Sequence, residues 1–191
     1  MTKALFLVDV QNDFTEHGAL GVEGGDAVAR RISEFLAAHA GDYAIVVASR
    51  DWHDADGDNG GHFSAHPDFV DTWPVHCVAG TFGAEYDEGF DTGAVTHHLK
   101  KGQGEPAYSL FEGRADDGRT ALQLLEEHGI LDIDLAGIAT DYCVRASALD
   151  ALAAGRHVRV LTDLIAGVHP DSSERALAEI AHAGGVLATA D

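Results

Sequence analysis

The 191-residue chain has few of the features of a secreted or membrane-bound protein. It has two cysteines and four prolines, and two cysteines do not make a disulfide framework. No apolar stretch approaches the roughly 20 residues needed to cross a membrane. The first residues run straight into a strand pattern, with no room for a signal peptide. These absences predict a cytoplasmic protein with free thiols.

Basic residues are also scarce, with 12 Lys and Arg against 32 Asp and Glu and a net charge of -20. Nucleic acids and anionic membranes both require clustered Lys and Arg. We therefore expect neither as a partner. The acidic residues are spread along the chain, which is typical of a solvated surface. Adaptation to high salt is an alternative that the charge balance does not decide.

Apolar runs typical of buried strands alternate with segments of helical periodicity along the whole chain. The length suits one domain with a sizeable core. We expect residues 1–191 to form a single domain. The predicted strands are 4–9, 43–49, 95–100, 133–138, 157–162 and 186–189. The predicted helices are 24–39, 119–128, 144–152 and one beginning near Asp171 or Ser172, with a capping-box pattern at 171–174. This order predicts a three-layer α/β/α sandwich around a mostly parallel, six-stranded, doubly wound sheet.

The stretch GIATDYCV, residues 137–144, is the one around which the chain is organised. A buried strand leads into it and a helix follows, with Thr140 or Asp141 available as the cap. Cys143 therefore falls in the first turn of a helix, where free N–H groups and the helix dipole favour a thiolate. A small buried thiol packed under the helix is the alternative.

Reactive side chains follow several predicted strands, at the edge of the sheet where ligands bind in such folds. Asp9, Asp51, a lysine pair ending in Lys101, and Cys143 all have this position. A thiol beside a carboxylate and a lysine suits acyl transfer, with the carboxyl group protonating the leaving group and then activating water. The backbone N–H groups of Ala139 and Cys143 could receive the oxyanion. Taken singly, Asp9 could cap a turn and Lys101 could be a solvated surface lysine.

A second group combines one carboxylate with three imidazoles: Asp51, His53, His62 and His76. These are ligands for a borderline divalent metal ion such as zinc, iron or manganese. Asp51 and His53 are two residues apart, so an extended segment places both side chains on one face. The other two lie in a long irregular segment, 55–92, of the kind that is usually functional. Because the chain has twelve histidines, ordinary surface histidines are the alternative.

Three aromatic residues near the same edge, Phe14, Trp73 and Tyr108, could sandwich a flat ring. Ordinary packing is the alternative for each of them. For any single one of them, ordinary packing is the better interpretation.

Taken together, these motifs resemble the isochorismatase-like cysteine hydrolases and, within that family, the nicotinamidases or pyrazinamidases. The matching stretches follow the family order over nearly the whole chain: VDVQNDF (8–14), DWH (51–53), HFS (62–64), WPVHC (73–77), KG (101–102), AYS (107–109) with FEG (111–113), and GIATDYCV (137–144). Each stretch alone is weak, but the ordered set is highly specific.

The resemblance implies a set of site residues. They are a triad of Cys143, Asp9 and Lys101, a single divalent metal ion held by Asp51, His53, His62 and His76, a cis peptide joining Ile138 and Ala139 at the oxyanion site, and pocket walls from Phe14, Trp73 and Tyr108.

The resemblance also implies an activity. Nicotinamide, or a pyrazinamide-like amide, is the expected substrate, and nicotinate and ammonia form through a thioester on Cys143. The pyridine nitrogen coordinates the metal. A hydrolase of another small amide or of isochorismate is the alternative within the fold, and a non-catalytic binding module is the alternative outside it. Family members frequently self-associate, so a homo-oligomer is expected, although the sequence shows no interface.

Overall fold

The computed structural model describes residues 2–190. Its centre is a six-stranded sheet in the order β3-β2-β1-β4-β5-β6, with every neighbouring pair parallel. The strands are β1 (Lys3–Val8), β2 (Ile45–Asp51), β3 (His97–Lys101), β4 (Asp132–Ile138), β5 (His157–Ala166) and β6 (Val186–Ala188). The chain winds from the centre to one edge through β1 to β3, and from the centre to the other edge through β4 to β6. The predicted six-stranded sheet is confirmed, and it is fully parallel.

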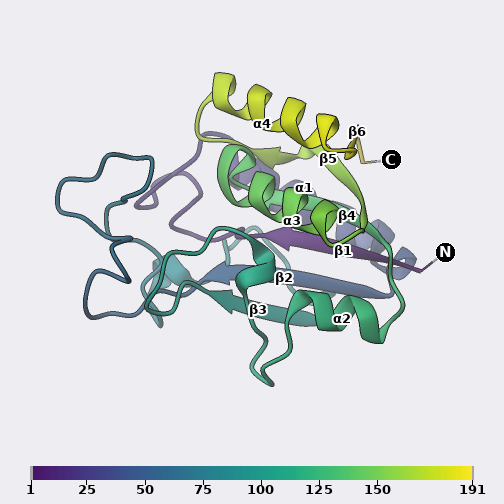
Figure 1. Ribbon diagram of the computed structural model, residues 1–191, viewed down its shortest axis with the longest axis horizontal. Helices are drawn as coiled ribbons and strands as arrows, with labels where there is room; N and C mark the ends of the chain where they lie inside the picture. The colour runs from purple at the N-terminus through teal and green to yellow at the C-terminus, as the bar shows by residue number, and fades with distance from the viewer. Residues whose placement is uncertain (1, 191) are drawn as a thin grey trace.

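Helices cover both faces of the sheet, as predicted (Figure 1). Helices α2 (Ala121–Glu127), α3 (Arg145–Ala153) and α4 (Pro170–His182) contribute to the core on one face, and α1 (Gly25–His39) covers the other. Short 3-10 turns are η1 (Ala40–Asp42), η2 (Phe82–Ala84) and η3 (Leu110–Glu112). The arrangement is the three-layer α/β/α sandwich that the alternating pattern predicts.

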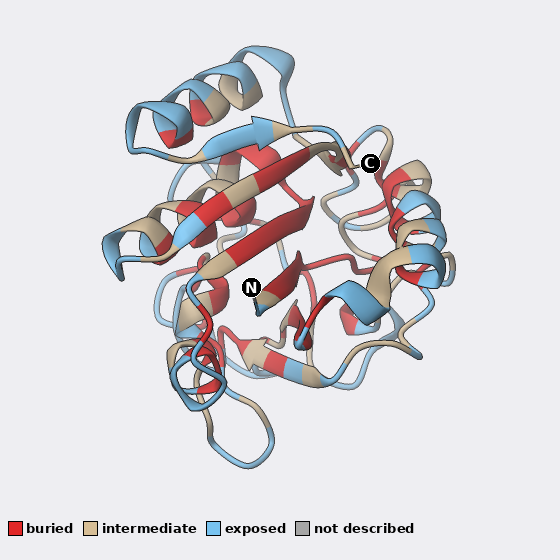
Figure 2. Ribbon diagram, turned by 90° about the vertical axis from the view of Figure 1, so that its right-hand side faces the viewer, coloured by how far each residue is buried: buried red, intermediate tan, exposed pale blue. Residues whose placement is uncertain are grey.

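Strand β1 shows why the central strands read as continuous apolar runs. Ala4, Phe6 and Val8 pack in the core beneath α2 and α3, whereas Leu5 and Leu7 pack beneath α1. Both faces of a central parallel strand are buried, so neither face retains polar residues. Figure 2 shows this burial concentrated in the middle of the sheet, with the outer faces of the helices exposed.

The start of α4 differs from the prediction. The helix begins at Pro170, with His169 as its N-cap residue, and no side chain of that residue caps it. The expected capping box at 171–174 is therefore wrong. Proline at the first helical position has its φ already fixed for a helix, so the helix begins earlier than the pattern suggested.

The carboxyl ends of the strands meet at one edge of the sheet, and the long connection between β2 and β3 extends beyond that edge (Figure 1). Functional side chains placed at these strand ends are thus covered by this connection. None of the helices within residues 2–190 has both the length and the apolar character to span a membrane.

Candidate active site

Cys143 lies in a π-helical turn, η4 (Thr140–Val144), that links β4 to α3. The sequence predicted a first α-helical turn capped by Thr140 or Asp141; neither side chain caps it. The turn is fixed instead by Ser147, whose Oγ donates to the Cys143 carbonyl oxygen at 2.6 Å and accepts from the Leu110 N–H at 2.8 Å. The cis peptide between Ile138 and Ala139 is present, as the resemblance implied.

The three predicted triad residues lie together at the carboxyl ends of β1, β3 and β4. Lys101 Nζ is 3.0 Å from Asp9 Oδ2 and 3.7 Å from Cys143 Sγ. Asp9 is fully buried, Lys101 is 1% exposed and Cys143 is 7% exposed. Ser49 Oγ donates a 2.6 Å hydrogen bond to Asp9 Oδ1. The thiol, the carboxylate and the ammonium group are therefore held in one dry cluster.

Lys101 also contacts a second carboxylate, that of Asp51. The two residues face each other in the parallel register of β2 and β3, which explains the contact. Burial by itself would lower the pKa of Lys101, but Asp51 and Asp9 outweigh it and hold that pKa well above its ordinary value. The ammonium group thus stays charged between two acids.

The surroundings of Cys143 act on its pKa in opposite directions. Burial raises the pKa of the Cys143 thiol well above its ordinary value; Lys101 opposes the shift, while Asp9 and Asp51 add to it. The position in the turn and the charge of Lys101 favour a thiolate, and burial beside two carboxylates acts against it. Burial also raises the pKa of Asp9, with Lys101 opposing it. A protonated thiol requires a base, and Asp9 is the adjacent carboxyl group.

The four predicted metal ligands also lie together. One ring nitrogen from each of His53, His62 and His76 lies within 4.8 Å of the others. Asp51 Oδ2 is 3.7 Å from His53 Nε2 and 3.8 Å from His76 Nε2. All four residues are buried. Three imidazoles and a carboxylate are a donor set that suits zinc and similar divalent ions.

The surrounding bonds orient two of these rings. His53 Nδ1 donates to the Gly102 carbonyl oxygen at 2.8 Å, and His76 Nδ1 donates to the Pro74 carbonyl oxygen at 2.8 Å. Both rings therefore present Nε2 to the cluster, which is the usual arrangement around a metal. Among the described side chains, His53 Nε2 and His62 Nδ1 are buried without a hydrogen-bond partner. Buried ring nitrogens without a hydrogen-bond partner are what is expected of nitrogens that bind a metal ion.

Charge in the cluster also suits a cation. Burial would raise the pKa of Asp51, but Lys101 and the nearby His53 and His76 rings lower it well below its ordinary value. Burial, with His53 and His76 nearby, lowers the pKa of His62 to about 4. His62 is thus neutral at pH 7, and the neutral imidazole is the form that binds metals.

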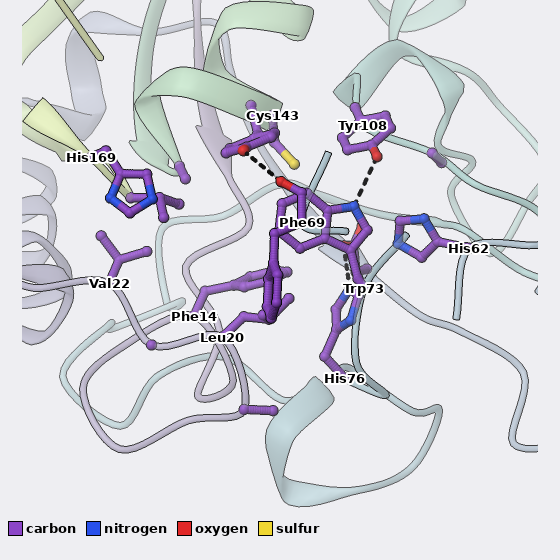
Figure 3. Close-up of a pocket in the computed structure, with 17 residues that line it drawn as sticks. Phe14, Leu20, Val22, His62, Phe69, Trp73, His76, Tyr108, Cys143 and His169 are labelled. Atoms are coloured by element: carbon purple, nitrogen blue, oxygen red, sulfur yellow. Dashed lines mark hydrogen bonds and ion pairs between the residues drawn. The ribbon is translucent and has the colours of Figure 1, made fainter. Parts of the chain in front are cut away.

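A cavity of about 460 Å³ opens onto both clusters (Figure 3). Cys143 and the three residues Asp51, His62 and His76 line it, together with the predicted aromatic residues. Trp73 Nε1 donates to the Tyr108 hydroxyl at 3.0 Å, and the Phe14 ring lies 5.6 Å from the His76 ring. The aromatic side chains therefore form the walls near the histidines.

Sequence reasoning missed several residues here. Tyr142, Leu20, Val22, Val168 and His169 also line the cavity. Tyr142 directly precedes Cys143 in the GIATDYCV stretch, so its position was a signal. The other four lie on connections far from any motif that suggested a site.

Gln11 is a further residue that the sequence did not single out. Its side chain accepts from the Asp51 N–H at 2.8 Å and donates to the Asp51 carbonyl oxygen at 2.9 Å. The Gln11 side chain therefore links the end of β2 to the segment after β1, and this link places Asp51 beside Asp9. Its position in the VDVQNDF stretch was the available signal.

Comparison with known proteins gives one consistent result. The family model described as the isochorismatase domain matches residues 3–191. The chain is 48% identical to the nicotinamidase/pyrazinamidase of Mycobacterium tuberculosis over 178 residues, 93% of this chain and 94% of that protein. The structure resembles that of Pyrococcus horikoshii pyrazinamidase in complex with zinc, with a TM-score of 0.83, 36% identity and 99% of each chain covered. It also resembles PnC1 from L. infantum in complex with nicotinate, with a TM-score of 0.83, 32% identity, and 98% of this chain and 92% of that chain covered.

Proposed function

Because the chain belongs to the isochorismatase family, we propose that it is a nicotinamidase, hydrolysing nicotinamide and pyrazinamide-like amides to the acid and ammonia. One observation supports this choice above the others: Cys143 and the metal-binding residues Asp51, His62 and His76 line the same cavity. A pyridine carboxamide has a ring nitrogen that a metal can bind and an amide carbonyl that a thiol can attack. One small molecule can therefore engage both clusters at once.

The triad residues supply the acyl transfer. Asp9 takes the Cys143 proton, and Sγ attacks the amide carbonyl carbon, forming a tetrahedral oxyanion near the backbone N–H groups of Ala139 and Cys143. Asp9 then gives the proton to the amide nitrogen, the C–N bond breaks, and ammonia leaves a nicotinoyl thioester. Asp9 next takes a proton from water, which attacks the thioester and releases nicotinate and the thiol. Lys101 balances the negative charge of these steps.

Asp51, His53, His62 and His76 would hold one divalent ion, zinc, iron or manganese. When bound, the ion supplies a Lewis-acid contact for the pyridine nitrogen, which positions the ring. Phe14, Trp73 and Tyr108 contact the faces of the ring, exclude water and keep the amide at the thiol. Residues of the chain thereby orient the substrate at both ends.

Ammonia release from nicotinamide by the purified, metal-loaded protein tests the proposal. We expect turnover that Cys143→Ser abolishes, while metal content and thermal stability stay unchanged. Benzamide, which lacks the ring nitrogen, should be a poor substrate. Mild alkylation should label Cys143 and spare Cys77, which is fully buried. Nicotinamide left intact, with another amide or isochorismate consumed, would contradict the proposal.

We also propose that residues 1–191 form one isochorismatase-like hydrolase domain, which the match over residues 3–191 and the single sheet support. A cytoplasmic location and a homo-oligomeric state stay predictions from the sequence and the family.

A further inference from the structure

The cavity extends in two directions from Cys143. In Figure 3, His62 and Tyr108 lie on one side of the thiol, and Val22 and His169 lie on the other. The first side contains the metal-binding residues. The second side contains no metal-binding residue among those that line the cavity, and we call it the distal half; Val22, His169 and the adjacent Val168 line it.

The cavity is larger than nicotinamide requires. A cavity of about 150 Å³ is enough to hold one benzene ring, and nicotinamide has only three more heavy atoms than benzene. The volume here is about 460 Å³. A ring that reaches from the histidines to Cys143 fills the first side, and the distal half stays available for another part of the substrate.

The wall of the distal half is a fixed part of the structure. Asp141, in the same turn as Cys143, is 9% exposed. Its carboxylate accepts hydrogen bonds from the N–H groups of Val168 at 2.9 Å and His169 at 3.2 Å, and from Ser172 Oγ at 2.6 Å. The Asp141 carboxylate therefore links the wall of the distal half to the turn that contains Cys143.

The distal half is also mainly apolar. Val22 and Val168 line it, with the His169 imidazole beside them. Val22 is 2% exposed and Val168 is 38% exposed, so the space runs from the buried interior towards solvent. Such a surface is suited to an alkyl chain rather than to a charged group.

We propose that the distal half binds an apolar substituent on the amide nitrogen, and that the enzyme also hydrolyses N-alkylnicotinamides. This inference rests on the proposed function, since it takes the ring as lying against the metal-binding side. The amide nitrogen then lies beyond the carbonyl carbon, where Asp9 protonates it, and the substituent on the nitrogen extends towards Val22 and Val168. Cys143 Sγ forms the same nicotinoyl thioester, the C–N bond breaks, and Asp9 protonates the departing nitrogen. An alkylamine leaves in place of ammonia.

The test compares nicotinamide with its N-methyl, N-propyl and N-butyl derivatives, with nicotinate release measured by chromatography on the metal-loaded enzyme. We expect kcat/KM to rise from N-methyl to N-butyl by up to about fourfold for each buried methylene. In Val168→Trp the ratio of kcat/KM for N-butylnicotinamide to that for nicotinamide should fall about tenfold, because the indole occupies the space of the chain.

Val186→Trp is the matched control, because Val186 is 56% exposed on β6 and does not line the cavity; its ratio should equal that of the wild type. Hydrolysis of nicotinamide with no hydrolysis of any N-alkyl derivative would overturn the inference and leave the proposed function standing. So would a chain accepted on the ring carbon C5 but refused on the amide nitrogen. Nicotinamide left intact would overturn both.

Discussion

Gly102 shows how one backbone position can govern a metal ligand. Its φ is +81°, its carbonyl oxygen accepts the His53 Nδ1 hydrogen bond, and a Cβ at this position would lie 2.5 Å from His53 Cε1. Any larger residue must therefore displace the imidazole as well as strain the backbone. The KG pair matched the family motif, and its glycine contacts a predicted metal ligand.

We predict that Gly102→Ala lowers zinc affinity by about 10- to 100-fold, as loss of an orienting partner of a metal ligand does. Competition with a chromophoric chelator measures the affinity. Gly118→Ala is the control, since Gly118 has a similar φ of +87° but open space around its Cβ position. Equal zinc affinity in the two variants would contradict the role of Gly102.

Lys101 and Lys100 are neighbours in sequence with opposite environments. Lys101 is buried between Asp9 and Asp51, whereas Lys100 is paired at 3.0 Å with Asp116, whose side chain is 87% exposed. We predict that Lys101→Met abolishes turnover and lowers the free energy of unfolding by about 3–5 kcal/mol, because it leaves buried carboxylates without a partner. Lys100→Met should cost no more than about 1 kcal/mol.

Urea denaturation of the two variants measures both values. The combination Lys101→Met with Asp9→Asn should cost less than the sum of the two single changes, since each removes the partner of the other. Simple addition of the two costs would contradict a shared charge cluster.

At the scale of elements, Asp141 joins the turn η4 to the segment that begins α4. We predict that Asp141→Ala lowers kcat for nicotinamide by up to about 100-fold, because a displaced nucleophile misses the carbonyl carbon. Asp141→Asn keeps one acceptor oxygen and should recover part of the loss. Asp171→Ala, an acidic residue in the first turn of α4, is the control and should match the wild type.

Steady-state kinetics and thermal melting separate positioning from general damage. A positioning role predicts a fall in kcat that is larger than any change in KM and that Asp141→Asn partly reverses. An unchanged kcat with a lower melting temperature would show that Asp141 only stabilises the fold.

The elements themselves were predictable, because burial on both sides makes β1, β2 and β4 mainly apolar, and α1 has a clear helical stripe. Strand β5 is four residues longer than predicted, ending at Ala166. Its last residues pair with β4 only after a shift in register, and a local pattern cannot show such a shift. The π-helical turn at Cys143 was equally hidden, since it depends on contacts with Leu110 and Ser147.

The site was predictable where motifs marked it and unpredictable where packing decided it. The positions of Asp9, Lys101 and Cys143 follow from strand ends, which lie at one edge in any parallel sheet. The contact between Asp51 and Lys101 requires the register of β2 with β3. The raised pKa of Cys143 requires knowledge of how completely the thiol is buried, and a residue pattern does not contain that quantity.

At the scale of the molecule, one carboxylate links several strands near their amino ends, at the edge of the sheet away from the active site. Asp134 accepts hydrogen bonds from Lys3 Nζ at 3.2 Å, the Tyr43 hydroxyl at 2.7 Å, and Arg159 Nε and Nη2 at 2.7 Å. These residues belong to β1, the entry to β2, and β5. Burial would raise the pKa of Asp134, but the hydrogen bonds from Arg159 and Tyr43 outweigh it and lower that pKa.

A lowered folded pKa stabilises the protein above the unfolded pKa of an aspartate, about 3.9. This stabilisation is lost as pH falls through the folded pKa. We predict that the difference in free energy of unfolding between the wild type and Asp134→Asn is largest at neutral pH and shrinks as pH falls below about 4. Urea denaturation across this range measures it, with Asp132→Asn as the control. A constant difference would contradict the role of the charge.

The sheet order divides the chemistry between two pieces of chain. Strands β1 to β3 and their connections contain Asp9, Lys101 and all four predicted metal ligands, while the Cys143 thiol follows β4. The connection between the sides passes Leu131, which is 49% exposed. Cut there, fragments 1–130 and 131–191 should each be inert, and ammonia should form only when β1 and β4 pair again. If each fragment were fused to one of two other proteins, nicotinamide would be hydrolysed only where those two proteins bind each other. The pair of fragments would then serve as a reporter of that interaction.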